Sequence, residues 1–521
     1  MPTNSFRFIS SRVDLSSRPQ LSISRGPVFI QTTDGADLFK TDLTGLNRIG
    51  FRYTPAGINP PGSALPCRTI ESAPTAYRVS WEDRSPFVHV TKDGLGIQGT
   101  KGFRSARCNA PIRDGNWYME VKIIHGGGEH VGDDTNHEGT HVRLGWGRRE
   151  APLNGPVGLD GYSYGYRDKT GERVTLSRPR PYGRPFSSGD VVGMYISLPP
   201  RRPPNKKDPH DPAHIKRERI PIDLKGQEVF EMLEYPVSKE MAALMDYSNK
   251  SSTSAPLPST SNKKTKLPDR PSTNARTNTT PLRPLPILSG SVIAFFVNGE
   301  SQGIAFQDIY DYLQLRMTET TRKKEKEKKR GREGVKEHRE NPFDDGTLGY
   351  YPFVSVFNNA RVQLNPGPHF EFLPPSDIDA LLFDREPSAQ QTWRPISERY
   401  TEFMQEQRDL DRQEEEEAKL ELERLQQRDK IEAEKKAERA RKAEARKRLK
   451  TADSSEDLTS LGPTPLSQPS PLRNSTAYDA SVGNSPAVSR NSENGDVDDE
   501  QDRVVSELIT ESLYPQSDDN M

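Results

Sequence analysis

Cysteine is almost absent from this chain of 521 residues, which contains only Cys67 and Cys108. Two thiols cannot form a disulfide framework, and they are too few for a zinc finger built on cysteine ligands. A reducing, intracellular environment is the expectation that follows.

Long apolar runs and an N-terminal signal are missing as well. No stretch approaches the roughly 20 apolar residues that a membrane-spanning helix needs, and residues 1–14 hold no apolar signal core. We therefore expect a soluble protein without a membrane partner.

Apolar residues are scarce, and the charges nearly cancel. Hydrophobic residues make up 31% of the chain, below the roughly 45 to 50% of ordinary globular domains. The formal net charge of -1 excludes a chain-wide field that would attract nucleic acid, although local blocks are strongly charged. Most aromatic residues fall in Tyr77–Leu198 and Ser289–Phe372, so one folded domain with long tails is expected.

The aromatic-rich part of the sequence is typical of an all-β protein, because short apolar runs recur between turn signals. Trp117, Met119, Val121 and Ile123 alternate with more polar residues. This period of two is typical of a half-buried strand. Further along, the pair Asn298-Gly299 predicts a type I′ hairpin turn, whose two central residues need positive φ.

The same alternation predicts that two arginines face away from the core. In residues 142–146 the apolar side chains occupy alternate positions, so Arg143 faces away from the core. In residues 162–166 three tyrosines share one face, and Arg167 lies on the other. Guanidinium groups held on rigid strands recognise carboxylates in bidentate fashion. Two ordinary solvated arginines are the alternative.

Composition divides the chain into six parts. We expect a β-sandwich domain interrupted by Ser/Thr/Pro-rich or highly charged segments that lack enough apolar residues to offset the entropy of ordering. The parts are an N-terminal extension (1–76), the sandwich domain (77–375) with disordered insertions at about 248–286 and 318–346, a following segment (376–402), a charged helix (403–450), a disordered linker (451–501) and a short terminal helix (502–515).

The charged helix is acidic in its first half and basic in its second, as the helix macrodipole favours. Its leucines do not sustain a heptad, so we interpret it as a solvated single helix rather than a coiled coil. Basic runs at Arg322–Arg332 and Lys435–Lys450 leave nucleic-acid binding and nuclear import open as two hypotheses.

The terminal helix carries apolar residues on one face and follows a polar tract. It is too short to be stable alone, so it should fold against a partner. Docking onto its own sandwich is the alternative. The residues expected at the contact are Val505, Leu508, Ile509 and Leu513.

No catalytic pattern appears. The sequence has no nucleophile elbow, no phosphate-binding loop and no dinucleotide fingerprint, so we expect no enzyme, no cofactor and no small-molecule substrate. The loop from His125 to His141 combines histidines and aspartates, including His130, Asp133, Asp134 and His137. A metal site there is the minor alternative, and a polar loop between strands is favoured.

Six strings together resemble the SPRY domain of the Ash-two/Bre-two family. They are GNWYMEV (115–121), THVRLGWG (140–147), GYSYGYRDKTGE (161–172), SSGDVVGMYISLP (187–199), VIAFFVNGESQGIAFQDIY (292–310) and YYPFVSVFNNARVQLNPGPHFEF (350–372). The similarity returns at residues 393–398 and 504–514. It implies an all-β, SPRY-type antiparallel sandwich.

The resemblance also implies a function. Fungal members are non-catalytic subunits of COMPASS, a nuclear complex whose SET-domain subunit methylates histone three at lysine four. The SPRY domain would bind an acidic segment of the WD-repeat scaffold subunit, and the terminal helix would bind the Dpy-thirty-type dimer. Contact with nucleosomal DNA through the basic insertions stays open. The residues carried over to the acidic-segment site are Arg143, Pro156 and Arg167, with Phe103 and Leu159 where relatives place tyrosines.

The alternative function from another class is a SPRY substrate adaptor of a ubiquitin ligase. It is disfavoured because the sequence shows no cullin-binding box and no Cys/His-rich RING, and because it gives the terminal helix no role.

Overall fold

A computed structural model describes residues 26–32, 37–43, 45–47, 50–100, 102–130, 139–245, 282–316 and 340–453, with side chains up to residue 448. Most of the two expected insertions, residues 454–501 of the linker and the terminal helix at 502–515 lie outside these ranges. The chain divides into two compact units at Lys435, within the last helix, and residues 436–453 are described only as part of that helix.

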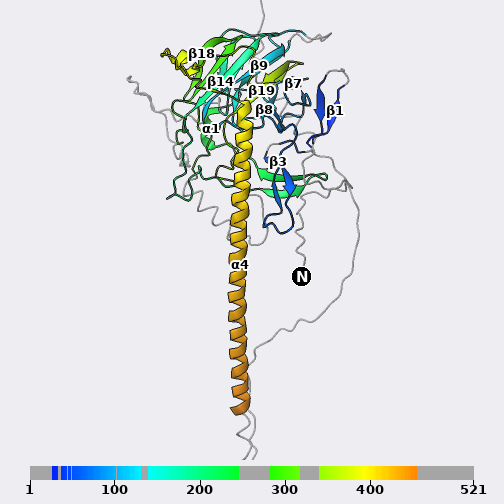
Figure 1. Cartoon of the computed structure of the whole chain (residues 1–521), viewed down its shortest axis with the longest axis vertical. Helices are drawn as coiled ribbons and strands as arrows, with labels where there is room; N and C mark the ends of the chain where they lie inside the picture. Colours follow the sequence, from blue (N-terminus) through cyan, green and yellow to red (C-terminus); the bar gives the residue numbers. More distant parts are fainter. Residues whose placement is uncertain are drawn as a thin grey trace, which may run out of the picture. The chain divides into compact units, whose positions relative to one another are not determined.

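Two large sheets make up most of the fold, and a small third sheet lies beside them (Figure 1). All strand pairs are antiparallel except β21 with β9. The ten-stranded sheet runs β1 (Phe29–Gln31), β2 (Phe39–Thr41), β6 (Val88–Val90), β7 (Gly96–Gly99), β20 (Arg361–Asn365), β9 (Gly115–His125), β14 (Val191–Leu198), β17 (Val292–Val297) and β18 (Glu300–Gln307), with β21 (Arg394–Pro395) beside β9. The seven-stranded sheet runs β13 (Arg178–Arg180), β12 (Arg173–Thr175), β11 (Ser163–Arg167), β10 (His141–Gly147), β19 (Tyr351–Phe357), β8 (Arg104–Cys108) and β5 (Val79–Arg84).

The small sheet has four strands, and three helices are described. Its order is β15 (Ile220–Asp223), β16 (Glu228–Leu233), β3 (Phe51–Ile58) and β4 (Cys67–Thr69). The helices are α1 (Lys239–Met245), α3 (Ile378–Phe383) and α4 (Ser397–Asp453).

The core lies between the two large sheets, where alternate residues of each strand meet. Trp117 from β9, Leu144 and Trp146 from β10 and Phe295 from β17 belong to one buried cluster. The predicted all-β sandwich is therefore confirmed. The predicted hairpin is confirmed too, because Asn298 and Gly299 have φ values of 51° and 81° between β17 and β18.

The outward face of β9 is buried, contrary to the half-buried strand predicted from its alternation. Tyr118 packs edge-on against Phe370 at 5.0 Å and lies 5.4 Å from Trp393 between ring centroids. The Glu120 carboxylate accepts the backbone N–H groups of Glu371 and Phe372 at 2.7 and 2.8 Å. Residues that follow the sandwich in the sequence fold back over this face, which the local pattern of β9 cannot encode.

The N-terminal region contributes strands to two sheets, which corrects its assignment as a mere extension. β1 and β2 join the ten-stranded sheet, and β3 pairs with β16, for example Tyr53 with Glu231. The pairing of β3 with β16 joins residues about 180 positions apart. A short strand-like string such as residues 28–31 gives no local sign of such a partner.

The tyrosine pattern of residues 162–166 is confirmed only in part. Tyr164 and Tyr166 belong to the main core, but Tyr162 packs in a separate cluster with Val157 and Met241. The strand begins at Ser163, so Tyr162 lies outside the regular alternation.

Helix α4 begins at Ser397, before the predicted start at residue 403. Tyr400, Phe403 and Met404 lie on one face of its first turns and join the sandwich core. This i, i+3, i+4 spacing anchors the helix. Every described side chain from Glu421 to Arg448 is exposed, as predicted for a solvated helix.

Both cysteines are buried and unbridged. Burial raises the pKa of the Cys67 thiol to about 11, so the thiolate is a minor species at neutral pH. No helix in the described ranges is long and apolar enough to span a bilayer.

Candidate peptide-binding surface

Arg143 and Arg167 lie directly opposite each other on neighbouring strands. They form a register pair between β10 and β11. The adjacent pair, Leu144 and Tyr166, is buried in the core. Because side chains alternate along a strand, the two arginines face outward from the seven-stranded sheet, and both are half-buried.

An aromatic pair supports the Arg143 side chain. Its guanidinium carbon lies 4.6 Å from the centroid of the Phe103 ring, and Phe103 lies 4.9 Å from Phe357 between centroids. Arginine stacks on a ring through cation–π attraction, which leaves the edge of the guanidinium directed elsewhere. Phe103, at the entry to β8, thus restricts the orientation of Arg143.

Arg167 forms an ion pair with Glu172, a residue of the turn that follows β11. Its Nη1 lies 2.7 Å from Glu172 Oε2, and the two side chains are 29% and 26% exposed. Thr170 Oγ1 also donates to Glu172 at 2.6 Å. Such an exposed pair contributes only about 0 to 1 kcal/mol, so a second carboxylate can compete for the guanidinium.

A loop places Pro156 and Leu159 on the same outer face. The Val157 N–H donates to Ser355 Oγ at 2.8 Å, and Ser355 is the register partner of Arg143 on β19. Pro156 is buried next to this anchor, and Leu159 is half-buried. The structure thus brings together the five residues assigned to the acidic-segment site around β10.

Two glycines allow close approach here: Gly145 lets β11 lie close to β10, and Gly165 lets the loop at Val157 approach the sheet. A Cβ at Gly145 would collide with the carbonyl oxygen of Tyr164, and a Cβ at Gly165 would collide with the Val157 side chain. The glycines inside RLGW and SYGYR therefore have a steric role that sequence reasoning missed. Glycine inside a strand is the signal that could have revealed it.

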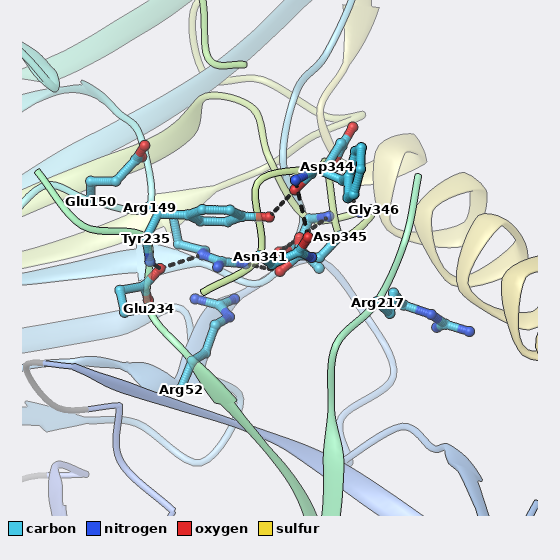
Figure 2. Close-up of polar contacts among 12 residues, drawn as sticks. Arg52, Arg149, Glu150, Arg217, Glu234, Tyr235, Asn341, Asp344, Asp345 and Gly346 are labelled. Atoms are coloured by element: carbon cyan, nitrogen blue, oxygen red, sulfur yellow. Dashed lines mark hydrogen bonds and ion pairs between the residues drawn. The ribbon is translucent and has the colours of Figure 1, made fainter. Parts of the chain in front are cut away.

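Sequence reasoning also missed a buried ion-pair network around Arg149 (Figure 2). Arg149 Nε lies 2.8 Å from Glu234 Oε1, and its Nη1 lies 2.5 Å from Asp345 Oδ2. Burial alone would lower the pKa of Arg149, but Asp345 and Glu234 raise it well above its ordinary value. The guanidinium is therefore charged, and its Nε and Nη1 are each paired with a carboxylate.

Asp344 and Asp345 correct the predicted end of the second insertion. They fall within 318–346, yet both are buried, and Asp344 is paired with Arg113. Buried carboxylates with matched arginines order this stretch despite its polar composition. The sequence DD beside a charged tract gives no sign of those distant partners.

A second group of ion pairs holds the start of α4. Arg217 and Arg219 each place Nη2 2.7 Å from Asp411 Oδ1, and Arg219 lies 2.7 Å from Glu414 Oε2. The two arginine side chains are only 3% and 8% exposed. These ion pairs attach the first turns of α4 to the segment between β14 and β15.

The loop between His125 and His141 is held by backbone contacts where it is described. Asp168 Oδ2 accepts the N–H groups of Val142 at 2.7 Å and Gly127 at 2.8 Å, and His141 Nδ1 lies 3.4 Å away. The described residues contain no group of three or more side chains suited to a metal ion. Asp133, Asp134 and His137 lie outside them, and His130 is exposed.

Comparison with known proteins identifies the class of this fold. The SPRY domain family matches residues 116–201, which run from β9 through β14. The chain is therefore a SPRY-domain β-sandwich protein. A crystal structure of a human SPRY domain aligns with 55% of this chain and 98% of its own, at 14% identity and a TM-score of 0.25.

Named relatives then show which SPRY proteins this chain resembles over most of its length. The chain is 33% identical to the Set1 complex component ash2 of Schizosaccharomyces pombe, over 73% of this chain and 48% of the relative. It is 34% identical to the COMPASS component cclA of Colletotrichum higginsianum, over 68% and 64%. It is 30% identical to the COMPASS component BRE2 of Saccharomyces cerevisiae, over 31% and 38%. The chain is thus similar to Ash2/Bre2-type SPRY proteins, and it spans 48% and 64% of the length of the first two relatives.

Proposed function

We propose that this chain is a non-catalytic subunit of a nuclear COMPASS-type histone methyltransferase complex, in which its SPRY surface binds an acidic segment of the WD-repeat scaffold subunit. The observation that carries this proposal is the register pair Arg143–Arg167, held outward beside Phe103 and Pro156. The printed names of the relatives, which are Set1 or COMPASS components, support it.

Binding follows from the chemistry of the surface. An extended acidic segment crosses the outer face of the seven-stranded sheet, and its carboxylates take hydrogen bonds from Arg143 and Arg167. Each such charged hydrogen bond contributes about 1.5 to 3 kcal/mol. Phe103 and Leu159 lack hydroxyl groups, so they offer the segment apolar contact at the rim.

The subunit acts by positioning its partners. The SET-domain subunit supplies the catalytic groups for methylating histone three at lysine four. This chain holds the acidic segment of the scaffold in one conformation, which lowers the entropic cost of assembling the active complex.

Titration calorimetry with an acidic scaffold peptide tests the surface. Arg143→Ala should weaken binding by about 10- to 150-fold, the equivalent of 1.5 to 3 kcal/mol, and should reduce stimulated methylation. Arg180→Ala is the matched control, because Arg180 is an exposed arginine on the edge strand β13. Equal affinity of the Arg143 variant and the control would refute the proposal.

The terminal helix is proposed to bind the Dpy-thirty-type dimer. Its contact residues, Val505, Leu508, Ile509 and Leu513, lie outside the described residues, so the proposal rests on their helical spacing. Leu508→Asp should abolish co-purification with the dimer, while Glu507→Gln, on the opposite face of the helix, should retain it. Retained co-purification of the Leu508 variant would remove this assignment.

Double-stranded DNA is a third proposed partner, through the basic end of α4. Lys435, Arg439, Lys442 and Arg446 recur every three or four residues, so they form one basic stripe on an exposed part of the helix. A helix about 10 to 12 Å across fits the major groove. Changing all four to Gln should weaken binding to a DNA duplex in a salt-dependent manner. Unchanged binding in gel shifts at two salt concentrations would exclude this stripe.

A further inference from the structure

A row of four side chains crosses the outer face of the seven-stranded sheet. Ser105 of β8 pairs in register with Ser355 of β19, and Ser355 pairs with Arg143 of β10. Arg143 pairs in turn with Arg167 of β11. Neighbouring strands lie about 4.8 Å apart, so Ser355 lies one strand spacing from Arg143 and Ser105 lies two. The row that begins with the two arginines of the proposed peptide surface thus continues into two hydroxyl groups.

The two serines are covered by the loop that carries Pro156. Both are 0% exposed, and their hydroxyl oxygens lie 2.7 Å apart. Ser105 Oγ donates to the carbonyl oxygen of Gly155 at 2.6 Å. The N–H of Val157 donates to Ser355 Oγ at 2.8 Å. These two bonds hold the backbone on either side of Pro156.

The hydrogen bond between the two hydroxyls has a direction that its neighbours fix. The carbonyl oxygen of Gly155 can only accept, so it takes the one hydroxyl proton of Ser105. Ser105 Oγ must then accept the proton of Ser355. Ser355 Oγ in turn accepts the N–H of Val157. Ser105 and Ser355 therefore form a hydroxyl relay in which each group has a partner, and such a satisfied buried network is rigid.

The proline makes this loop depend on its neighbours for anchorage. Pro156 has no N–H to donate, so the backbone groups of the residues beside it fasten the loop to the sheet. The carbonyl oxygen of Pro156 accepts the N–H of Leu159 at 3.2 Å, which closes a turn. The hydroxyl relay therefore sets the distance from Arg143 to Pro156 and, through the turn, the position of Leu159.

We propose that Ser105 and Ser355 are positioning residues of the peptide surface. Their hydroxyl relay holds the loop of Pro156 and Leu159 where it contacts an apolar ligand residue beside the carboxylates that Arg143 and Arg167 bind. The inference rests on the proposed function, because it assigns how the same surface selects its acidic ligand. Neither serine touches the ligand, since both are fully buried under the loop.

The test uses the full chain and two synthetic twelve-residue peptides, which carry Glu-Leu-Glu or Glu-Asn-Glu at the centre. Ser355→Ala removes the acceptor of the Val157 N–H and should weaken binding of the leucine peptide by about three- to tenfold. Binding of the asparagine peptide should change less than about twofold, because both arginines still meet the glutamates. Leu159→Ala should show the same preference, and combining it with Ser355→Ala should add little, because both changes act through one loop.

Ser291→Ala is the matched control. Ser291 is also 0% exposed, and its Oγ accepts the N–H of Ile309 at 2.9 Å. It directly precedes β17 of the ten-stranded sheet. This variant should lower the melting temperature, as Ser355→Ala should, but leave the affinity for both peptides unchanged. Ser105→Ala keeps the acceptor of the Val157 N–H, so it should give the same preference with a smaller loss, and it serves as the second variant if Ser355→Ala does not fold.

The outcomes separate this inference from the proposed function. An equal effect of Ser355→Ala on both peptides, or no effect on either, would overturn the positioning role and leave the Arg143 surface standing. A comparable loss of affinity in Ser291→Ala would trace the effect to stability alone and would overturn the positioning role as well. No binding of either peptide to the wild-type chain would overturn the proposed function together with this inference.

Discussion

Arg143 and Arg149 lie six residues apart, yet they occupy opposite environments. Arg143 stacks on Phe103 at the outer face of a strand whose neighbouring residues are buried. Arg149 is enclosed between Glu234 and Asp345 after the same strand has ended. The comparison shows that strand alternation places one arginine on the outer face of a sheet, where we propose that it binds a ligand, whereas carboxylates from distant segments enclose the other.

The energetic reason is solvation. Removing one partner from a buried ion pair leaves an uncompensated charge in a medium that solvates it poorly. Removing an arginine from the surface leaves water to fill its place. Substitution by alanine should therefore lower the free energy of unfolding at Arg149 and lower peptide affinity at Arg143.

The largest loss of stability is expected from substitution of the buried Arg149. Arg149→Ala should lower the free energy of unfolding by about 3 to 5 kcal/mol, because it leaves Asp345 and Glu234 without their counter-ion. Denaturant unfolding followed by tryptophan fluorescence measures this loss. An Arg149→Met variant that kept wild-type stability would show that hydrophobic packing replaces the network. Wild-type stability of Arg149→Ala itself would contradict the comparison.

An intermediate effect on the free energy of unfolding is expected from Asp160, which lies in the loop that carries Leu159. Burial raises the pKa of Asp160 to about 6, above the ordinary value near 3.9. The folded state therefore holds this proton more tightly than the unfolded state. Its contribution to stability is present below about pH 4 and is lost as pH rises through about 6. Asp160→Asn should remove this dependence.

The measurement is the difference in unfolding free energy between wild type and Asp160→Asn from pH 4 to 7. The wild type should lose stability relative to the variant as pH rises. Asp83 titrates in the opposite sense: burial would raise its pKa, but Arg52 and Arg107 hold it below its ordinary value. Its contribution is lost only as pH falls below about 4, so the two groups act in different pH ranges. A constant difference between the two proteins would show that Asp160 has no such role.

The smallest effect on stability is expected at the recognition site. Arg143→Ala should change the free energy of unfolding by about 0.5 kcal/mol or less, because only surface contacts are lost. The same variant should lose most of its affinity for an acidic peptide. A loss of stability comparable with that of Arg149→Ala would mean that Arg143 belongs to the structural network instead.

Local patterns predicted the central strands because strand alternation and turn type each depend on only a few neighbouring residues. The alternation in residues 142–146 gives the direction of Arg143, and Asn298-Gly299 gives the hairpin turn. Those features depend on period two and on positive φ, both of which are local properties. The resemblance of the strings then supplied the assignment of Pro156 and Leu159.

Features built from distant segments escaped prediction. Asp345 lies in a stretch expected to be disordered, and its partner Arg149 is nearly 200 residues away. The pairing of β3 with β16 and the cover over Tyr118 likewise need segments that no local window contains.

The sequence by itself determined that this chain folds into a β-sandwich with Arg143 and Arg167 facing outward, because side-chain alternation is a property of the strand alone. The tertiary structure decided which arginines are enclosed. It brings β10 and the loop at Pro156 together, and it supplies carboxylates from distant segments to Arg149. Solvation and pairing depend on neighbours from distant segments, and only the folded chain brings those neighbours together.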